Sequence, residues 1–385
     1  MQAVIDARGH AGALGSFDAV LLGTVMALLS LSIIMVFSVT VVDDSDGGAS
    51  FARIARHSAH IAVGVIAMLL ISRFSPVFWQ RAARLLLVAG ILLLILVLIP
   101  AIGIEVNGSR RWLGIASIRV QPSELMKFIM IVFMADYLTR RRGQLKSFRL
   151  GVVNVAAVVG VVGMLLLLEP DLGSTVVIAA TVFAMMYVAG VRYSHMVLCI
   201  SVAATAFAAL VYLSPYRLQR VLSFQDPWAD PWNTGFQLSQ ALIAFGRGEW
   251  LGAGLGQSIQ KLFYLPHAGN DFLAAVIAEE LGFAGILVLI TLYMLLVWRG
   301  FAIARQADQG GHDCAALIAR GATILIALQA IINLGVNMGV LPTKGLTLPL
   351  VSYGGSSMIV TLMLVGLVLG VDRQVRMPAA GRGST

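Results

Sequence analysis

The polar residues of this chain gather in one long segment that ends on a single aspartate. Between positions 213 and 271 the sequence collects arginines, a lysine, tryptophans and carboxylates within an otherwise apolar chain, and an apolar stretch begins at Phe272. Asp271 can cap a helix there, because a carboxylate at that place accepts backbone N–H groups and suits the positive end of the helix dipole. It can equally act as a general base. The residues leave both roles open, and Asp271 is the leading candidate for the chemistry.

A cationic turn in the segment 102–122 can supply a partner for an anionic substrate. Arg111 and Trp112 stand side by side in it. This pair is an ordinary anchor at a membrane surface, since tryptophan favours the headgroup level and arginine extends toward water. A guanidinium is also a natural bidentate partner of a pyrophosphate, so the same pair can bind an anionic lipid.

The segment 341–357 holds a second cation in an irregular setting. Two prolines and three glycines surround Lys344, which predicts a re-entrant segment that lines a cavity. Freed backbone N–H groups there, together with Ser352 and Ser356, can hold an anion. Close packing of helices through small residues explains the same pattern, and both interpretations stand.

Several charged residues fall within or beside apolar stretches. Glu124 and Lys127 lie three positions apart, on one face of a helix, and form either a structural ion pair or a substrate contact. Glu279 and Glu280 lie deeper in the stretch that follows Asp271, and we predict structural pairing with Lys127 or with Lys344. Two further cations are candidates for supporting roles: Arg247 and Lys261.

The elements that must position these residues are membrane helices. The chain has 385 residues, 59% of them hydrophobic and 12% charged, which indicates an integral membrane protein. Its net charge of +8 indicates cytoplasmic loops and membrane lipids as partners, because no basic face on a soluble module favours nucleic acid. A span needs about 20 apolar residues. We predict ten spans, all α-helical: 17–40, 59–73, 84–101, 123–139, 149–168, 173–190, 194–213, 271–298, 315–340 and 348–371.

The break between 149–168 and 173–190 lies at Glu169-Pro170-Asp171. Proline cannot continue the first helix, and Asp171 can cap the second, so we expect mainly structural roles for both carboxylates.

The distribution of lysine and arginine favours cytoplasmic termini. The chain then forms one domain over 1–385, with a span bundle at 17–371, a large periplasmic loop at 214–270 between spans seven and eight, and a cytoplasmic tail at 372–385. The two cysteines lack metal-ligand spacing, so we expect neither a disulfide nor a zinc site.

Taken together, these motifs resemble the FtsW/RodA/SpoVE family, also called SEDS proteins, and the division member of the family more than the elongation member. The matching segments are NGSRRWLG with QPSELMK at 107–127, EPDLGS at 169–174, GFQLSQALIAFGRGEWLGAGLGQSIQK at 235–261, DFLAAVIAEELG at 271–282 and GVLPTKGLTLPLVSYGGSS at 339–357.

The resemblance implies a ten-span peptidoglycan glycosyltransferase of the bacterial inner membrane that polymerises lipid II into glycan strands at the division septum. The family's catalytic aspartate falls on Asp271, its functional lysine on Lys344 and its Arg-Trp pair on Arg111 and Trp112. It further implies a class B penicillin-binding transpeptidase and other divisome proteins as partners, and an active site on the periplasmic side.

The chain departs from the family pattern directly before Asp271. Where the family has LPEAHTDF, this chain reads LPHAGNDF, so that His267 replaces a glutamate and Asn270 a threonine. A divalent cation such as Mg²⁺ or Mn²⁺ therefore lacks a complete set of oxygen ligands in the sequence. The competing functions are a lipid II flippase, which intramembrane charges and broken helices suit, an elongation-type polymerase and a non-catalytic scaffold.

Overall fold

The computed structural model describes residues 17–41, 49–106, 108–115, 118–214, 218–219, 223–233, 235–265, 268–342 and 345–376. The described helices are α2 (Ala19–Val41), α3 (Ala49–Arg73), α4 (Pro76–Leu98), α5 (Pro122–Arg140), α6 (Asn154–Leu168), α7 (Leu172–Val188), α8 (Tyr193–Tyr212), α10 (Phe236–Gly248), α11 (Leu273–Gln309), α12 (Asp313–Asn337) and α13 (Gly355–Arg376). Short helical turns precede or follow them at η1 (Arg142–Gln144), η2 (Arg149–Val153) and η3 (Gln260–Tyr264).

The chain is a multi-pass membrane protein. Among the described residues, seven helices are long and apolar enough to cross a membrane, and α7 and the first part of α8 are shorter apolar helices. α5 is of similar length but carries Glu124, Lys127 and Asp136. The spans predicted to start at 59 and 84 lie in helices that begin earlier, at Ala49 and Pro76. Polar residues at these helix starts had concealed the extra turns.

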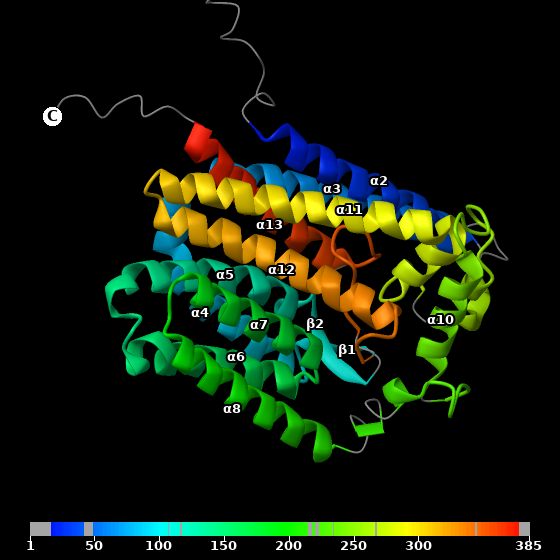
Figure 1. Ribbon diagram of the computed structural model, residues 1–385, viewed down its shortest axis with the longest axis horizontal. Coiled ribbons are helices and arrows are strands. Elements are labelled where there is room, and N and C mark those ends of the chain that lie inside the picture. Colours follow the sequence, from blue (N-terminus) through cyan, green and yellow to red (C-terminus); the bar gives the residue numbers. More distant parts are fainter. Residues whose placement is uncertain are drawn as a thin grey trace, which may run out of the picture.

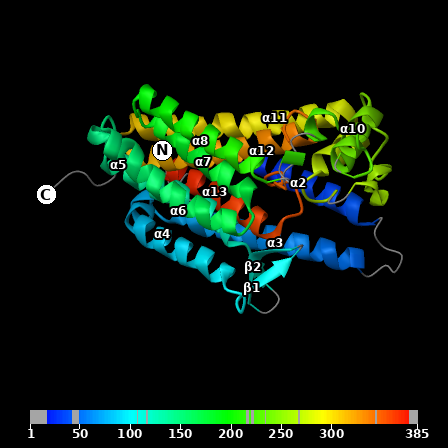
Figure 2. The same cartoon turned by 90° about the horizontal axis from the view of Figure 1, so that it is seen from below.

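The helices run roughly alongside one another, and α13 lies in the middle of the bundle in both views (Figures 1 and 2). α13 packs on α3, and α12 packs on α11, α5 and α7. These central helices form much of the core, because the apolar stretch of α13 is 83% buried and that of α12 is 67% buried. The described chain ends lie at the end of the bundle opposite α10 (Figure 1).

The predicted all-α class is wrong for the segment between α4 and α5. It folds into a three-stranded antiparallel sheet of β1 (Gly103–Val106), β2 (Ser109–Ile115) and β3 (Ile118–Val120), in the order β1-β2-β3. Ile104 pairs with Trp112, and Leu113 with Val120. Gly108 has φ +73°, a conformation that glycine adopts at little cost in a hairpin turn.

The last predicted span is shorter than expected. Residues 345–354 are not helical, and α13 begins at Gly355. The irregular segment predicted around the second proline is therefore confirmed over its described part, while Lys344 lies outside the described residues.

Candidate active site

Asp271 lies directly before α11, and the capping position of that helix is occupied by Phe272. The helix N-cap, one of the two roles that the sequence leaves open for Asp271, is therefore not observed. The side chain is half-buried, and a Cβ atom placed on Gly345 would lie 3.0 Å from its Oδ2 atom. The carboxylate thus faces the described start of the last polar segment.

Backbone contacts join the residues before Asp271 to the segment 345–353. The Ser352 hydroxyl donates to the carbonyl oxygen of Asn270 at 2.5 Å, and the backbone N–H of Tyr353 donates to that of Gly269 at 2.9 Å. Ser352 also accepts from the N–H of Leu348 at 3.0 Å. Two motifs far apart in sequence are therefore brought together as predicted, but the Ser352 hydroxyl is already engaged within the protein.

Ser356 likewise makes bonds within the fold. Its hydroxyl accepts from the backbone N–H of Gln121 at 3.1 Å and donates to the carbonyl of Arg119 at 3.4 Å. These bonds join the start of α13 to the residues just before α5. A role in holding substrate stays a prediction for both serines.

Arg111 lies on β2 and contacts the turn between α6 and α7. Its Nε donates to the carbonyl of Glu169 at 2.9 Å, and its Nη2 donates to that of Pro170 at 2.8 Å. Trp112 is half-buried beside it. Arg111 is therefore attached to this turn, and the remaining N–H groups of its guanidinium are left for other acceptors.

The turn itself holds a capping carboxylate and a buried one. Asp171 caps α7 as predicted, because its Oδ1 accepts from the N–H of Ser174 at 3.0 Å, and its Oδ2 accepts from the Ser123 hydroxyl at 2.9 Å. Glu169 is fully buried, and neither of its carboxylate oxygens has a hydrogen-bond partner among the described residues. Burial, with added repulsion from Asp171, raises the pKa of Glu169 to about 8 against the opposing effect of Arg111.

Glu124 and Lys127 form a structural ion pair. Lys127 Nζ lies 2.6 Å from Glu124 Oε1, and the lysine is one of the largest fully buried side chains. Lys127, which we also predicted as a possible partner of Glu279 or Glu280, is therefore paired with Glu124.

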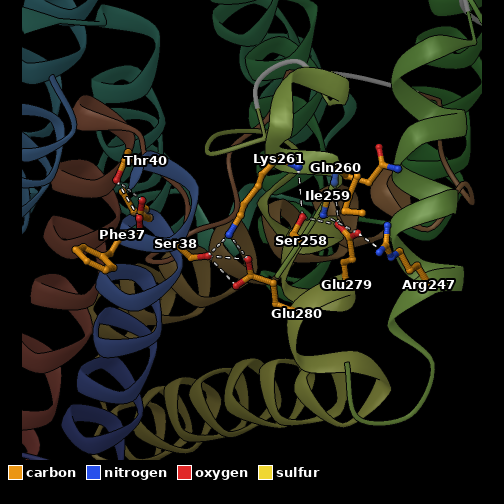
Figure 3. A network of polar contacts seen from close by, with 11 residues as sticks. Phe37, Ser38, Thr40, Arg247, Ser258, Ile259, Gln260, Lys261, Glu279 and Glu280 are labelled. Atoms are coloured by element: carbon orange, nitrogen blue, oxygen red, sulfur yellow. Dashed lines mark hydrogen bonds and ion pairs between the residues drawn. The ribbon is translucent and has the colours of Figure 1, made fainter. Parts of the chain in front are cut away.

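Glu279 and Glu280 are paired, as predicted, but with other partners (Figure 3). Lys261 Nζ lies 2.8 Å from Glu280 Oε1, and the Ser38 hydroxyl of α2 donates to the same oxygen at 2.6 Å. Lys127 is excluded as partner by its own pair. The polar segment 214–270 thus supplies the counterion through Lys261.

Glu279 fixes the start of η3 on α11. Its carboxylate accepts from the N–H of Ile259 at 3.0 Å, from the N–H of Gln260 at 3.2 Å and from the Ser258 hydroxyl. Arg247 Nε lies 3.7 Å from Glu279 Oε1 at the end of α10. Arg247, Lys261 and the two glutamates therefore hold the polar segment against the helix that follows Asp271.

α11 is broken at Gly282, where φ is +67° and ψ is −165°. The residues 249–254 pair with the backbone groups that the break releases. Four hydrogen bonds cross between the two segments: Ala253 N to Glu279 O at 2.9 Å, Gly254 N to Glu280 O at 3.1 Å, Phe283 N to Glu249 O at 2.9 Å and Ala284 N to Trp250 O at 3.1 Å.

Three residues near Asp271 and the last polar segment were missed in the sequence. Asn333 and Asn337 of α12 both donate to the carbonyl oxygen of Asp271. His57 of α3 contacts the Ser32 hydroxyl at 2.8 Å and stacks at an angle on Tyr353, with ring centroids 5.5 Å apart. Two asparagines four positions apart in an apolar helix were the available signal, whereas the scattered histidines offered none.

A metal site is not formed by the described side chains. Within these residues no group of three or more His, Cys, Asp or Glu side chains is placed to hold a metal ion, and His267 lies outside them.

Comparison with known proteins identifies relatives over nearly the whole chain. The FtsW/RodA/SpoVE family, described as cell cycle proteins, matches residues 18–377. A protein of Nitrosococcus halophilus, named as a probable peptidoglycan glycosyltransferase FtsW, is 50% identical over 368 residues, which cover 95% of each chain.

Two solved structures are similar as well. A chain from a peptidoglycan synthase complex that coordinates polymerization and crosslinking is 31% identical, with a TM-score of 0.77, over 94% of this chain and 99% of that one. The rod shape determining protein RodA of Thermus thermophilus is 28% identical, with a TM-score of 0.67, over 94% and 98%.

Proposed function

We propose, from the premise that the chain belongs to the FtsW/RodA/SpoVE family, that it is a peptidoglycan glycosyltransferase that polymerises lipid II during septal wall synthesis. The identity of 50% to a relative named FtsW, over 95% of both chains, supports the division role over the elongation role. The observation that carries the proposal is the position of Asp271, a half-buried carboxylate at the start of α11 facing the segment that follows Lys344.

The proposed reaction is an inverting glycosyl transfer. The 4-hydroxyl of an incoming lipid II attacks the anomeric carbon at the lipid-linked end of the growing glycan. The new O–C bond forms as the bond from that carbon to the pyrophosphate oxygen breaks, and the pyrophosphate leaves with the electron pair. Asp271 takes the proton from the attacking hydroxyl, which is the role of the base in inverting glycosidases. General-base catalysis contributes about 10²–10⁴-fold.

The charge that develops on the leaving group needs cations nearby. Lys344 and Arg111 are the proposed partners of the pyrophosphate, because fixed positive charge in a water-poor site stabilises a departing anion. Arg111 is held by two carbonyls of the α6–α7 turn, so its guanidinium is oriented before substrate arrives. Trp112, Ser352 and Ser356 support this wall of the site.

The proposed topology has ten spans with cytoplasmic termini and a periplasmic site. Both described chain ends lie at the end of the bundle away from α10, which fits an even number of spans (Figure 1). The segment 214–270 then lies in the periplasm, beside Asp271. A class B penicillin-binding transpeptidase is the proposed partner, supported by the likeness to a chain of a complex that couples polymerization and crosslinking. We place both at the division septum, with other divisome proteins.

The Asp271→Asn variant tests the assignment. Purified protein in detergent receives labelled lipid II, with and without Mg²⁺ or Mn²⁺, and polymer is read on a gel. We expect Asp271→Asn to remain folded and to make no polymer, since the amide cannot take the proton. The matched control is Asp226→Asn, an exposed aspartate of the polar segment whose Oδ1 accepts from the N–H of Trp228, a bond that asparagine retains. Full polymerisation by Asp271→Asn refutes the catalytic role.

The same assay separates the polymerase from a flippase or a scaffold, because detergent offers no second compartment. The intramembrane charges that favoured a transporter are paired with one another or with the polar segment. Because these charges are paired within the protein, the main argument for a transporter is lost.

A further inference from the structure

We propose that Asn333 and Asn337 are positioning residues that hold the backbone of Asp271 in register with the last polar segment. The inference rests on the proposed function, because it takes Asp271 as the base. Neither asparagine touches the carboxylate in the contacts described above. Both act on the peptide carbonyl of Asp271, and so on where its side chain starts.

Asn333 bridges the two segments that form the site. Its Nδ2 donates to the carbonyl of Asp271 at 2.8 Å and to the carbonyl of Leu346 at 2.6 Å. A primary amide has two N–H groups, and both are used here. Leu346 is two residues past Lys344, so one amide fixes the spacing between the proposed base and the backbone that carries the proposed cation.

Asn337 holds Asp271 from one helical turn further along α12. Its Nδ2 donates to the carbonyl of Asp271 at 2.9 Å and to that of Asn333 at 2.9 Å, and its Oδ1 accepts from the N–H of Ala275 at 3.2 Å. It therefore also satisfies a backbone donor in the first turn of α11. Unlike Asn333, it makes no described bond to the segment 345–353.

The burial of both amides makes these bonds specific. Asn333 is 1% exposed and Asn337 is 0% exposed. A buried polar group is retained when it is hydrogen-bonded, and removing its partner leaves an unsatisfied buried group that destabilises the fold. Two buried amides of an otherwise apolar helix donate to one carbonyl oxygen, and together they fix the position of the Asp271 backbone. A displacement of about 1 Å in a catalytic group costs on the order of 10²-fold in rate.

A structural role and a positioning role predict opposite rankings of the variants Asn333→Leu and Asn337→Leu. Asn337 bonds to α11 and to its own helix in addition to Asp271, so a structural role makes Asn337→Leu the more damaging change. Asn333 alone among the two reaches Leu346, so a positioning role makes Asn333→Leu the more damaging change for turnover. Leucine has the same branching as asparagine, so it removes the donors and leaves no cavity.

The experiment measures polymerisation of labelled lipid II by the purified full chain, together with its melting temperature. We expect Asn333→Leu to lower kcat about 10–100-fold with KM within about twofold, and Asn337→Leu to lower kcat less. Thr323→Val is the matched control, because Thr323 is buried on the same helix and its hydroxyl donates to Ala319 within that helix. We expect it to match the wild type.

Two results overturn the inference: a wild-type kcat in Asn333→Leu, or losses of kcat that follow the losses of melting temperature, with Asn337→Leu the worse in both. Asp271→Asn is run alongside. If the wild type makes no polymer, the proposed function has failed. If Asp271→Asn polymerises normally, the role of Asp271 as base has failed; if that variant is inactive while Asn333→Leu is normal, only the inference has failed.

Discussion

Single buried side chains set the conditions under which the site keeps its shape. Glu169 is the clearest case, since it is fully buried in the turn that anchors Arg111, and its carboxylate has no hydrogen-bond partner within the part of the chain that the structure describes. Its pKa is raised to about 8 by burial and by Asp171. The folded protein therefore binds a proton at Glu169 more tightly than the unfolded chain does.

This raised pKa fixes the sign of a pH dependence. A group whose pKa is higher in the folded state contributes stability below its unfolded value of 4.5, and that contribution is lost as the pH rises through about 8. We expect the melting temperature of the wild type to fall between about pH 5 and about pH 9 relative to Glu169→Gln. The exposed Glu105→Gln change serves as control. Parallel melting curves for wild type and Glu169→Gln across this range contradict the prediction.

At the residue scale, sequence reasoning identified the right polar groups more reliably than their partners. It placed Glu279 and Glu280 in structural pairs with Lys127 or Lys344. Lys127 is paired with Glu124 at 2.6 Å, Lys344 lies outside the described residues, and the observed partner of Glu280 is Lys261. Pairing depends on which helices are adjacent, and hydropathy says nothing of that. Asn333 was missed for the same reason, because the role of a buried amide depends on the carbonyl groups to which it donates, and the sequence does not show them.

The break in α11 is the element that joins the polar segment to the site. Glycines permit the close approach: a Cβ atom on Gly252 would overlap the carbonyl of Glu280, and one on Gly248 would overlap that of Ala278. Gly282 also needs φ +67°, which other L residues rarely adopt.

Gly252→Ala is expected to separate residues 249–254 from α11. The added methyl group must displace backbone, so we predict a lower melting temperature and at least a tenfold loss of polymerisation, because Asp271 closely precedes the part of α11 that lies before the break. Gly246→Ala is the matched control in α10, where a Cβ atom would meet nothing within 4 Å. There alanine should be neutral or slightly stabilising. Normal polymerisation by Gly252→Ala contradicts this account of the break.

The sheet shows why one element escaped the sequence. Asn107-Gly108 is a strong hairpin signal, and Ile104, Trp112 and Val120 are residues that strands favour. Because the elements were predicted from long apolar stretches, these short polar strands were assigned to a loop. The helices were predictable because a bilayer imposes one length and one composition on every span.

The whole molecule is tied together at the end opposite α10. Asp18, just before α2, accepts from Arg299 of α11 at 2.5 Å and from Arg376 of α13 at 2.6 Å. Burial raises the pKa of Asp18, but the hydrogen bond and charge of Arg299, with the charge of Arg376, outweigh it and hold the pKa below its usual value. One carboxylate thus joins the first, the longest and the last of the described helices.

Asp18→Asn is expected to loosen this junction. The buried carboxylate is 2% exposed, so losing its charge removes the ionic partner of Arg299 and one of the two ionic partners of Arg376, which keeps its pair with Asp372. We expect a cost of about 1–2 kcal/mol, which lowers the melting temperature by a few degrees. The exposed pair of Arg142 with Asp313 provides the comparison, and Asp313→Asn should change the melting temperature little. Equal effects of the two variants refute the junction.

The overall arrangement was predictable in its order and not in its contacts. The succession of apolar stretches and the junction of Asp271 with the segment 341–357 followed from motifs that recur together. That α10 and residues 249–254 pair with a broken helix did not, because hydrogen bonds between irregular segments leave no periodic signal in a sequence.

The break at Gly282 also separates the part of α11 that is long enough to cross the membrane from the part that precedes it. The part of α11 from Phe283 to Gln309 is about 40 Å long at 1.5 Å per residue, which exceeds a hydrocarbon core of about 30 Å. Biogenesis of this span can thus be driven by residues after the break. The nine residues from Leu273 to Leu281 need not partition into lipid, so Glu279 and Glu280 lie outside the stretch that is long enough to cross the hydrocarbon core.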